Sequence, residues 1–167
     1  LWESQMDSPS RFYDNRETIY AFLDKILVVC PQCHRCALNL RFDTSSRNLF
    51  APRRLVCHHC GLAREWADTV VASLEYNDPP LDNYFHVPLW LSVPCANHIL
   101  WAYNQRHLEV IEAFVTAQLR ERTRDPKYGW ANTSLTSRLP KWIGSARNRT
   151  TVLKALAQLK VRLSECL

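Results

Sequence analysis

Two cysteine pairs constrain the fold of this chain more than any other feature of its sequence. Cys30 and Cys33 form one C-x-x-C pair, Cys57 and Cys60 form a second, and 23 residues separate the two pairs. A C-x-x-C turn places two sulfur atoms on the same side of a tight loop, and two facing turns complete a tetrahedron of thiolates. Four thiolates are a usual ligand set of structural zinc, so the spacing predicts one structural Zn²⁺ with a β-hairpin between the turns.

Other readings of the cysteines and histidines remain open. A C-x-x-C pair can be a redox dithiol beside a βαβ pattern, although no such pattern is visible in this sequence. Side chains next to the pairs are competing ligands, namely His34, Cys36, His58 and His59. Cys95 and His98 have the spacing of half a second site, which His86, His107 or Cys166 would complete. The simpler interpretation is a buried cysteine and a hydrogen-bonded histidine.

Residues 30–66 resemble the zinc-ribbon family, whose two metal-binding turns read C-P-x-C-G and C-x-x-C-G. The match consists of Cys30-Pro31-Gln32-Cys33 and Cys57-His58-His59-Cys60-Gly61, with His34 at the position of the first glycine. Such ribbons occur in transcription factors, replication proteins, ribosomal proteins and enzyme subunits. The resemblance therefore implies a fold and a metal without identifying a partner. The stretches 88–91, 100–104 and 137–142 are similar to parts of small uncharacterised bacterial proteins that carry an N-terminal zinc ribbon.

The hydrophobic pattern predicts an α+β fold. Apolar residues at helical spacing predict an N-terminal helix over 14–28, with Asp14 and Glu17 as a capping box. Alternating or β-rich stretches predict ribbon strands in 38–42, 48–56 and 62–66. Further strands are predicted at 68–76, 85–93 and 98–103, and these are expected to extend the ribbon into one antiparallel sheet.

The last third of the chain is predicted to be helical and to pack on that sheet. Asn104 can cap a helix that runs to about residue 122, and short helical pieces follow in 133–146. A final helix over about 148–164 carries one apolar stripe, formed by Val152, Leu156, Leu159 and Leu163. We therefore divide the chain into an N-terminal helix (1–29), a zinc ribbon (30–66), a β-rich extension (67–104) and a helical basic region (105–167), which together form one compact unit.

The charge of the chain is unevenly distributed. The net charge is +5 overall, with +4 in 31–66, −4 in 67–104 and +7 in 105–167. Basic regions attract nucleic acids or acidic proteins, and an aromatic ring beside a cation can stack on a base. The candidate nucleic-acid contacts are Arg53, Arg54, Arg138, Lys141, Trp142, Arg147 and Lys154. The alternative interpretation is a solvated helix face, with the tryptophans in the core.

The sequence therefore predicts a zinc-stabilised binding protein that binds nucleic acid. It contains no P-loop, G-x-S-x-G, H-E-x-x-H or G-x-G-x-x-G motif, and four thiolates leave zinc no open position, so we expect no enzyme activity and no small-molecule substrate. The alternative is a protein-interaction module (an adaptor, regulator or immunity-type partner) with an acidic protein partner, which the acidic middle segment favours. Without a long apolar run or a secretory signal, we expect a cytoplasmic bacterial protein without membrane contact, starting naturally at Met6.

Overall fold

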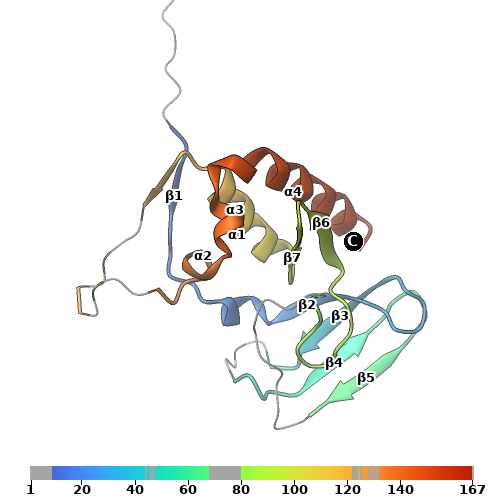
Figure 1. The fold of residues 1–167 in the computed structure, drawn as a ribbon. Coiled ribbons are helices and arrows are strands. Elements are labelled where there is room, and N and C mark those ends of the chain that lie inside the picture. Colours follow the sequence, from blue (N-terminus) through green and yellow to red (C-terminus); the bar gives the residue numbers. More distant parts are fainter. Residues whose placement is uncertain are drawn as a thin grey trace, which may run out of the picture.

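The computed structural model describes residues 9–43, 45, 48–67, 80–121, 124, 126–127, 129 and 132–166. Within these residues the chain has the predicted α+β class, with an antiparallel sheet on one side and helices on the other (Figure 1). The sheet has the order β2-β3-β4-β5 and every neighbouring pair is antiparallel. Its strands are β2 (Lys25–Val29), β3 (Cys36–Arg41), β4 (Arg53–Val56) and β5 (Ala63–Trp66), and we use the name ribbon sheet for these four strands.

The predicted N-terminal helix over 14–28 is wrong. This part of the chain contains the strand β1 (Arg11–Tyr13), the short 3₁₀ helix η1 (Ile19–Phe22) and the strand β2. Of the apolar residues that suggested a helical stripe, Phe22, Leu23 and Ile26 are buried and Ile19 is partly buried. The run Ile-Leu-Val-Val at 26–29 is continuous and rich in β-branched residues, which favours a buried strand. Pairing of β2 with β3, which sets Leu27 opposite Leu38, decides the structure here.

The strands after residue 80 do not extend the ribbon sheet as predicted. β6 (Leu91–Cys95) and β7 (His98–Ala102) form a separate antiparallel hairpin, with Ala96 in the left-handed region at φ 54°. The segments on either side of this hairpin touch the sheet, where Val29 N donates to Pro88 O at 2.8 Å, Trp90 N donates to Leu27 O at 2.9 Å, and Leu27 N donates to Tyr103 O at 2.8 Å. The predicted strand at 68–76 lies outside the described residues.

Asn104 connects the helical part to the N-terminal segment. Its Oδ1 accepts from the His107 N–H at 2.9 Å and caps α1 (Gln105–Thr116), as predicted. Its Nδ2 donates to Phe22 O at 2.9 Å and to Lys25 O at 2.8 Å. The helix ends six residues earlier than predicted, because the chain then forms β8 (Leu119–Glu121), which pairs in parallel with β1.

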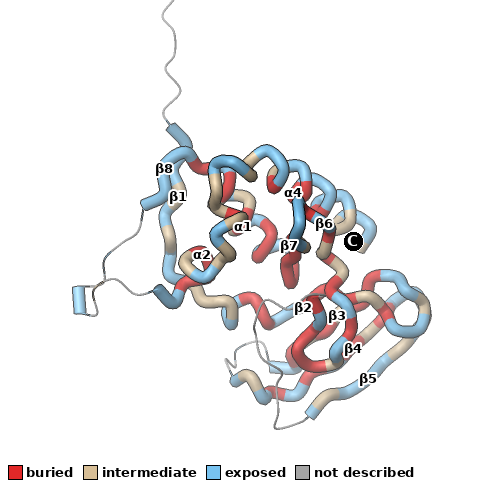
Figure 2. The backbone as a smooth tube through the Cα atoms, viewed as in Figure 1, coloured by how far each residue is buried: buried red, intermediate tan, exposed pale blue. Residues whose placement is uncertain are grey.

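The C-terminal elements are α2 (Leu135–Arg138), α3 (Lys141–Gly144), the 3₁₀ helix η2 (Ala146–Asn148) and α4 (Arg149–Ser164). The predicted stripe of α4 is buried at Val152, Leu156 and Leu159. It packs with α1, α3 and the β6–β7 hairpin in one core, while a second core lies between the ribbon sheet, η1 and Trp101 (Figure 2). Among the described residues, none of the helices has the length and apolarity required to cross a bilayer.

Candidate metal centre and basic residues

The four paired cysteines converge at one end of the ribbon sheet. Their sulfur atoms all lie within 4.8 Å of one another. Cys30 Sγ is 3.6 Å from Cys60 Sγ, and Cys33 Sγ is 3.5 Å from Cys57 Sγ. A tetrahedral zinc with Zn–S bonds of about 2.3 Å separates its sulfurs by about 3.8 Å. The four cysteines are therefore positioned to bind one metal ion.

Two matching turns produce this convergence. Each turn joins neighbouring antiparallel strands and is closed by a 2.9 Å backbone hydrogen bond, from His34 N to Cys30 O in the first turn and from Gly61 N to Cys57 O in the second. Both donor residues are left-handed, with φ of 60° at His34 and 75° at Gly61. Glycine adopts this conformation freely. His34 therefore has the backbone conformation that the ribbon pattern assigns to glycine, at some cost in strain.

The thiols have strongly divergent acidities. Burial raises the pKa of Cys30, but N–H groups at Cys33 and Gln32 and the neighbouring thiols lower it to about 7. The N–H of Leu62 lowers the pKa of Cys60, yet burial and the other three sulfurs raise it to about 12. Adjacent thiols cannot all ionise together because thiolate charges repel. A divalent cation removes this obstacle and deprotonates coordinating thiols, so the donor set fits a metal ion.

The competing ligands do not join this cluster. The sulfur of Cys36 is bonded to that of Cys166 in a disulfide. His34, His58 and His59 are exposed, and the candidate cluster of the described residues consists of the four paired cysteines. Among the residues that the structure describes, no second cluster forms around Cys95, which is buried in β6, and His98 instead stacks on Trp142 with ring centroids 4.7 Å apart.

The prediction that Arg53 is a surface contact is wrong. Arg53 is wholly buried, its Nε donates to Asn39 Oδ1 at 2.7 Å, and its Nη2 donates to Leu23 O at 2.5 Å. The guanidinium also lies 4.2 Å from the centre of the Tyr84 ring. Strand alternation directs Arg53 inward with Leu55. Sequence reasoning missed the Asn39 interaction because it is made only when β3 and β4 pair.

The neighbouring Arg54 is exposed but already engaged. It pairs with Glu65 at 2.7 Å across the strands and lies 4.8 Å from the centre of the Phe42 ring. The ribbon hairpin therefore presents much less free positive charge than its sequence suggested.

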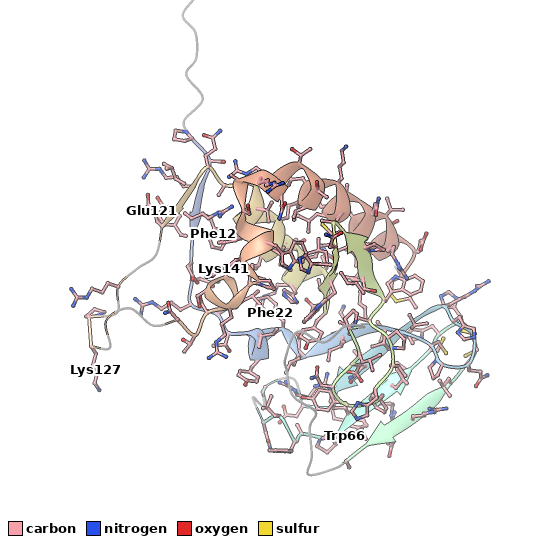
Figure 3. All side chains as sticks on the ribbon, viewed as in Figure 1. Phe12, Phe22, Trp66, Glu121, Lys127 and Lys141 are labelled. Atoms are coloured by element: carbon pink, nitrogen blue, oxygen red, sulfur yellow. A yellow bond between two sulfur atoms is a disulfide. The ribbon has the colours of Figure 1, made fainter. Side chains whose placement is uncertain are left out.

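The basic residues of the C-terminal third are arranged differently. Residues 132–166 contain seven basic side chains and one acidic side chain. Four of the predicted contacts are exposed and make no ion pair within the described residues, namely Arg138, Lys141, Arg147 and Lys154. Trp142 is half-buried against the core. Figure 3 shows Lys141 on the helical side of the molecule, apart from Trp66 at the ribbon sheet.

No protein-family model, curated protein or solved structure matches the chain. The class of the protein is therefore defined by its own geometry, as an α+β chain with a four-cysteine cluster that could hold a metal ion.

Proposed function

We propose that this chain is a zinc-stabilised nucleic-acid-binding protein whose contact surface is the basic C-terminal helical region. The observation that carries the proposal is the set of exposed cations at Arg138, Lys141, Arg147 and Lys154, in a segment with one acidic residue. Cations of this kind neutralise phosphates and release the counterions that surround a nucleic acid.

The metal in this proposal is one Zn²⁺ with a structural role. A zinc ion held by Cys30, Cys33, Cys57 and Cys60 is closed to water, so its contribution is to hold the two turns of the ribbon together. This chemistry supports a binding protein rather than an enzyme.

The contact surface proposed here is smaller than the one that the sequence suggested. Arg53 is buried and Arg54 is paired with Glu65, so neither provides a free cation on the ribbon. On the helical side, Trp142 and His98 form a stacked aromatic pair with an exposed histidine. Aromatic rings next to cations support contacts with unpaired bases as well as with phosphates.

A salt titration with a pair of matched variants tests the proposal. Fluorescence anisotropy would follow binding of labelled single-stranded and duplex DNA and RNA to the zinc-loaded protein. The double variant Lys141→Gln, Arg147→Gln should bind more weakly, and its slope of log K against log salt should be shallower by about 2. The control Lys25→Gln, Arg64→Gln removes the same charge from exposed positions of the ribbon and should behave as the wild type. Equal losses in both variants, or binding without salt dependence, would contradict the proposal.

The second candidate function is a protein-interaction module with zinc as scaffold. The observation that favours it is exposed aromatic surface where β3 leads into β4, with Phe42 54% and Phe50 50% exposed. The two residues flank the same connection between strands, and contiguous exposed apolar surface is typical of protein contact sites. In this case none of the four nucleic acids would bind, and Phe42→Ser would abolish binding to an acidic protein partner that Lys141→Gln leaves intact.

A further inference from the structure

A stack of two aromatic rings lies where the β6–β7 hairpin meets α3. His98, the first residue of β7, lies over Trp142 of α3 with ring centroids 4.7 Å apart and ring planes 9° from parallel. Trp142 is half-buried and packs against the core, whereas His98 is exposed. One face of the imidazole therefore contacts the indole ring, and the opposite face is open to solvent.

The hairpin that carries His98 is fixed on α4 by reciprocal contacts. Trp90 Nε1, just before β6, donates to Arg162 O at 2.8 Å, and Arg162 Nη1 donates to Ser92 O at 3.0 Å. The Arg162 guanidinium also lies 4.7 Å from the centre of the Trp90 ring. These contacts hold the hairpin in place on the helical region, so a ligand that stacks on His98 loses little free energy in ordering it.

Two exposed cations accompany the tryptophan of the stack. Lys141 directly precedes Trp142 in α3. Asn148 Nδ2 donates to Trp142 O at 3.0 Å, which holds the segment that carries Arg147 next to α3. Lys141 and Arg147 are both exposed, and Figure 3 shows Lys141 on the helical side of the molecule. An open aromatic face and cations that can hold phosphates thus belong to one region.

The hairpin adds no negative charge to this region. The four acidic residues of 67–104 all lie at positions 68–82, and the sequence 83–104 contains none. On the neighbouring helix α1, Glu112 is paired with Lys160 at 2.6 Å. The repulsion of phosphate expected from the acidic middle segment therefore does not originate in the hairpin.

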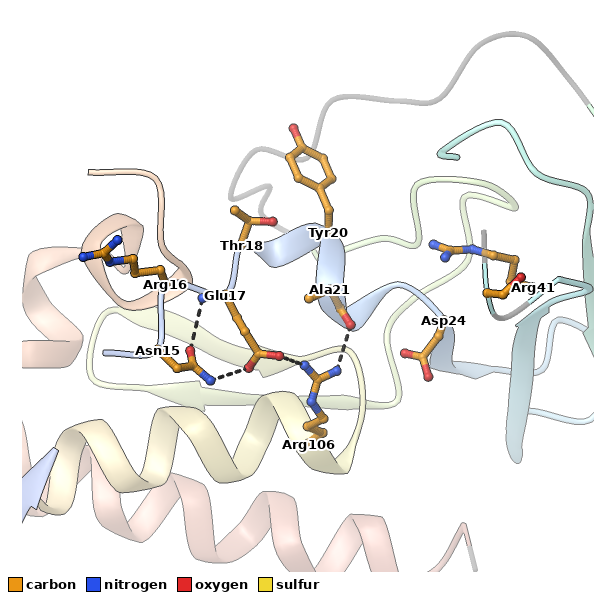
Figure 4. Close-up of a pocket in the computed structure, with 10 residues that line it drawn as sticks. Asn15, Arg16, Glu17, Thr18, Tyr20, Ala21, Asp24, Arg41 and Arg106 are labelled. Carbon is orange, nitrogen blue, oxygen red and sulfur yellow. Dashed lines mark hydrogen bonds and ion pairs between the residues drawn. The ribbon is translucent and has the colours of Figure 1, made fainter. Parts of the chain in front are cut away.

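The cavity where the N-terminal segment, the ribbon sheet and α1 meet has a different character (Figure 4). Its volume is about 610 Å³, and its lining includes Glu17, Arg41 and Arg106. The Glu17 carboxylate accepts hydrogen bonds from Arg106 and from Asn15 Nδ2, the latter at 2.8 Å, and Arg106 Nη1 donates to Ala21 O at 2.8 Å. Glu17 and Arg106 thus join the N-terminal segment to α1, and the open stack is the better candidate for a ligand contact.

We propose that the nucleic acid bound by this protein is single-stranded, with an unpaired base stacked on the outer face of His98 and adjacent phosphates at Lys141 and Arg147. This inference rests on the nucleic-acid binding proposed above and specifies its ligand. Unpaired bases stack on aromatic side chains, histidine included, and stacking tolerates any base because every base has a π-face. A base inside a duplex reaches such a ring only by leaving its pair and its stack, which costs free energy.

Fluorescence anisotropy on the zinc-loaded protein tests this inference with three labelled ligands of equal length. They are a single strand of mixed sequence, its blunt duplex, and a strand of abasic sites that keeps the phosphates. The mixed strand should bind about tenfold more tightly than the abasic strand, the loss expected for one stacked base, and also more tightly than the duplex. DNA and RNA single strands both satisfy the proposal, and their relative Kd identifies the preferred sugar.

The outcomes separate this inference from the proposed function. Equal binding of the mixed and abasic strands, with a steep dependence on salt, overturns the stacked base and leaves the phosphate contact standing. Tighter binding of the duplex than of the single strand does the same. Absence of binding by all three ligands overturns both proposals.

Variants locate the stacked base. His98→Ala should bring the Kd of the mixed strand close to that of the abasic strand, and an unchanged Kd for the abasic strand shows that the fold is intact. His98→Phe keeps a flat ring and should recover most of the affinity. Lys141→Gln should weaken both strands alike, because it removes a phosphate contact. His86→Ala removes another exposed imidazole and should change neither Kd. Wild-type binding of the mixed strand by His98→Ala overturns the assignment.

Discussion

His107 shows how a single residue can make the stability of this protein depend on pH. Its side chain lies near the rings of Phe22, Trp101 and Tyr103, at centroid distances of 5.2, 5.8 and 5.6 Å. Its Nδ1 accepts from the Tyr103 N–H at 3.1 Å, so the neutral ring carries its proton on Nε2. Burial lowers the pKa of His107 to about 3, and the folded protein therefore holds this imidazole uncharged.

We predict that His107 weakens the fold in mild acid. The pKa of an unfolded histidine is about 6.5, so below that pH the unfolded chain binds more protons than the folded chain. The His107 contribution to the unfolding free energy then falls as the pH drops from about 6.5 toward 3, by about 1.4 kcal/mol per pH unit. Urea denaturation at pH 5, 6 and 7.5 should show a shallower pH dependence in His107→Gln. His98→Gln, at an exposed position, should retain the wild-type slope, and identical slopes in all three proteins would refute the prediction.

At the scale of the secondary-structure elements, we expect the stability of the ribbon sheet to depend on its four paired cysteines. The turns bring four sulfurs together beside strands of only four to six residues. Short strands supply little stability of their own, and bound metal contributes directly to folding in such modules.

Substituting one ligand should therefore disorganise the whole element. We predict that Cys57→Ser lowers bound zinc well below one per chain and exposes the amides of 30–66 to exchange. Elemental analysis by mass spectrometry and hydrogen exchange would measure the two effects. Cys95→Ser alters a buried thiol outside the cluster and should keep one zinc. Full metal content in Cys57→Ser would rule out the assigned ligand set.

On the scale of the whole molecule, one covalent bond joins the ribbon to the C-terminal end of the chain. Cys36 at the start of β3 and Cys166 after α4 form a disulfide across 130 residues, with Cα atoms 5.4 Å apart. A cross-link that closes so long a loop restricts the unfolded chain strongly. The sequence suggests these two cysteines only as candidate metal ligands, because no spacing in it indicates a bond over this distance.

We predict that Cys166→Ser lowers the unfolding free energy by about 2–4 kcal/mol while zinc remains bound. Chemical denaturation should show that a reductant weakens the wild type by a similar amount and leaves the variant unchanged. Intact mass before and after alkylation reports the bond itself. A wild type that resists denaturant equally in both redox conditions would show that the cross-link contributes nothing.

The sequence alone determined the features that depend on short-range spacing. Two C-x-x-C turns place their sulfurs locally, so the four-residue cluster was predictable. The cap at Asn104 and the stripe of α4 were predictable for the same reason, since a helix repeats every 3.6 residues whatever surrounds it.

Tertiary structure alone decided the features that depend on distant partners. Residues 26–29 became a strand because β3 lies beside them, and among the described strands β7 pairs with β6 alone. The Arg53 side chain points inward, where it donates a hydrogen bond to Asn39 and lies over the Tyr84 ring. Arg41 and Arg106 came together at one cavity although 64 residues lie between them. Local sequence patterns indicate which residues can be buried. They do not indicate which buried residues contact each other, because these contacts form between segments that are far apart in the sequence.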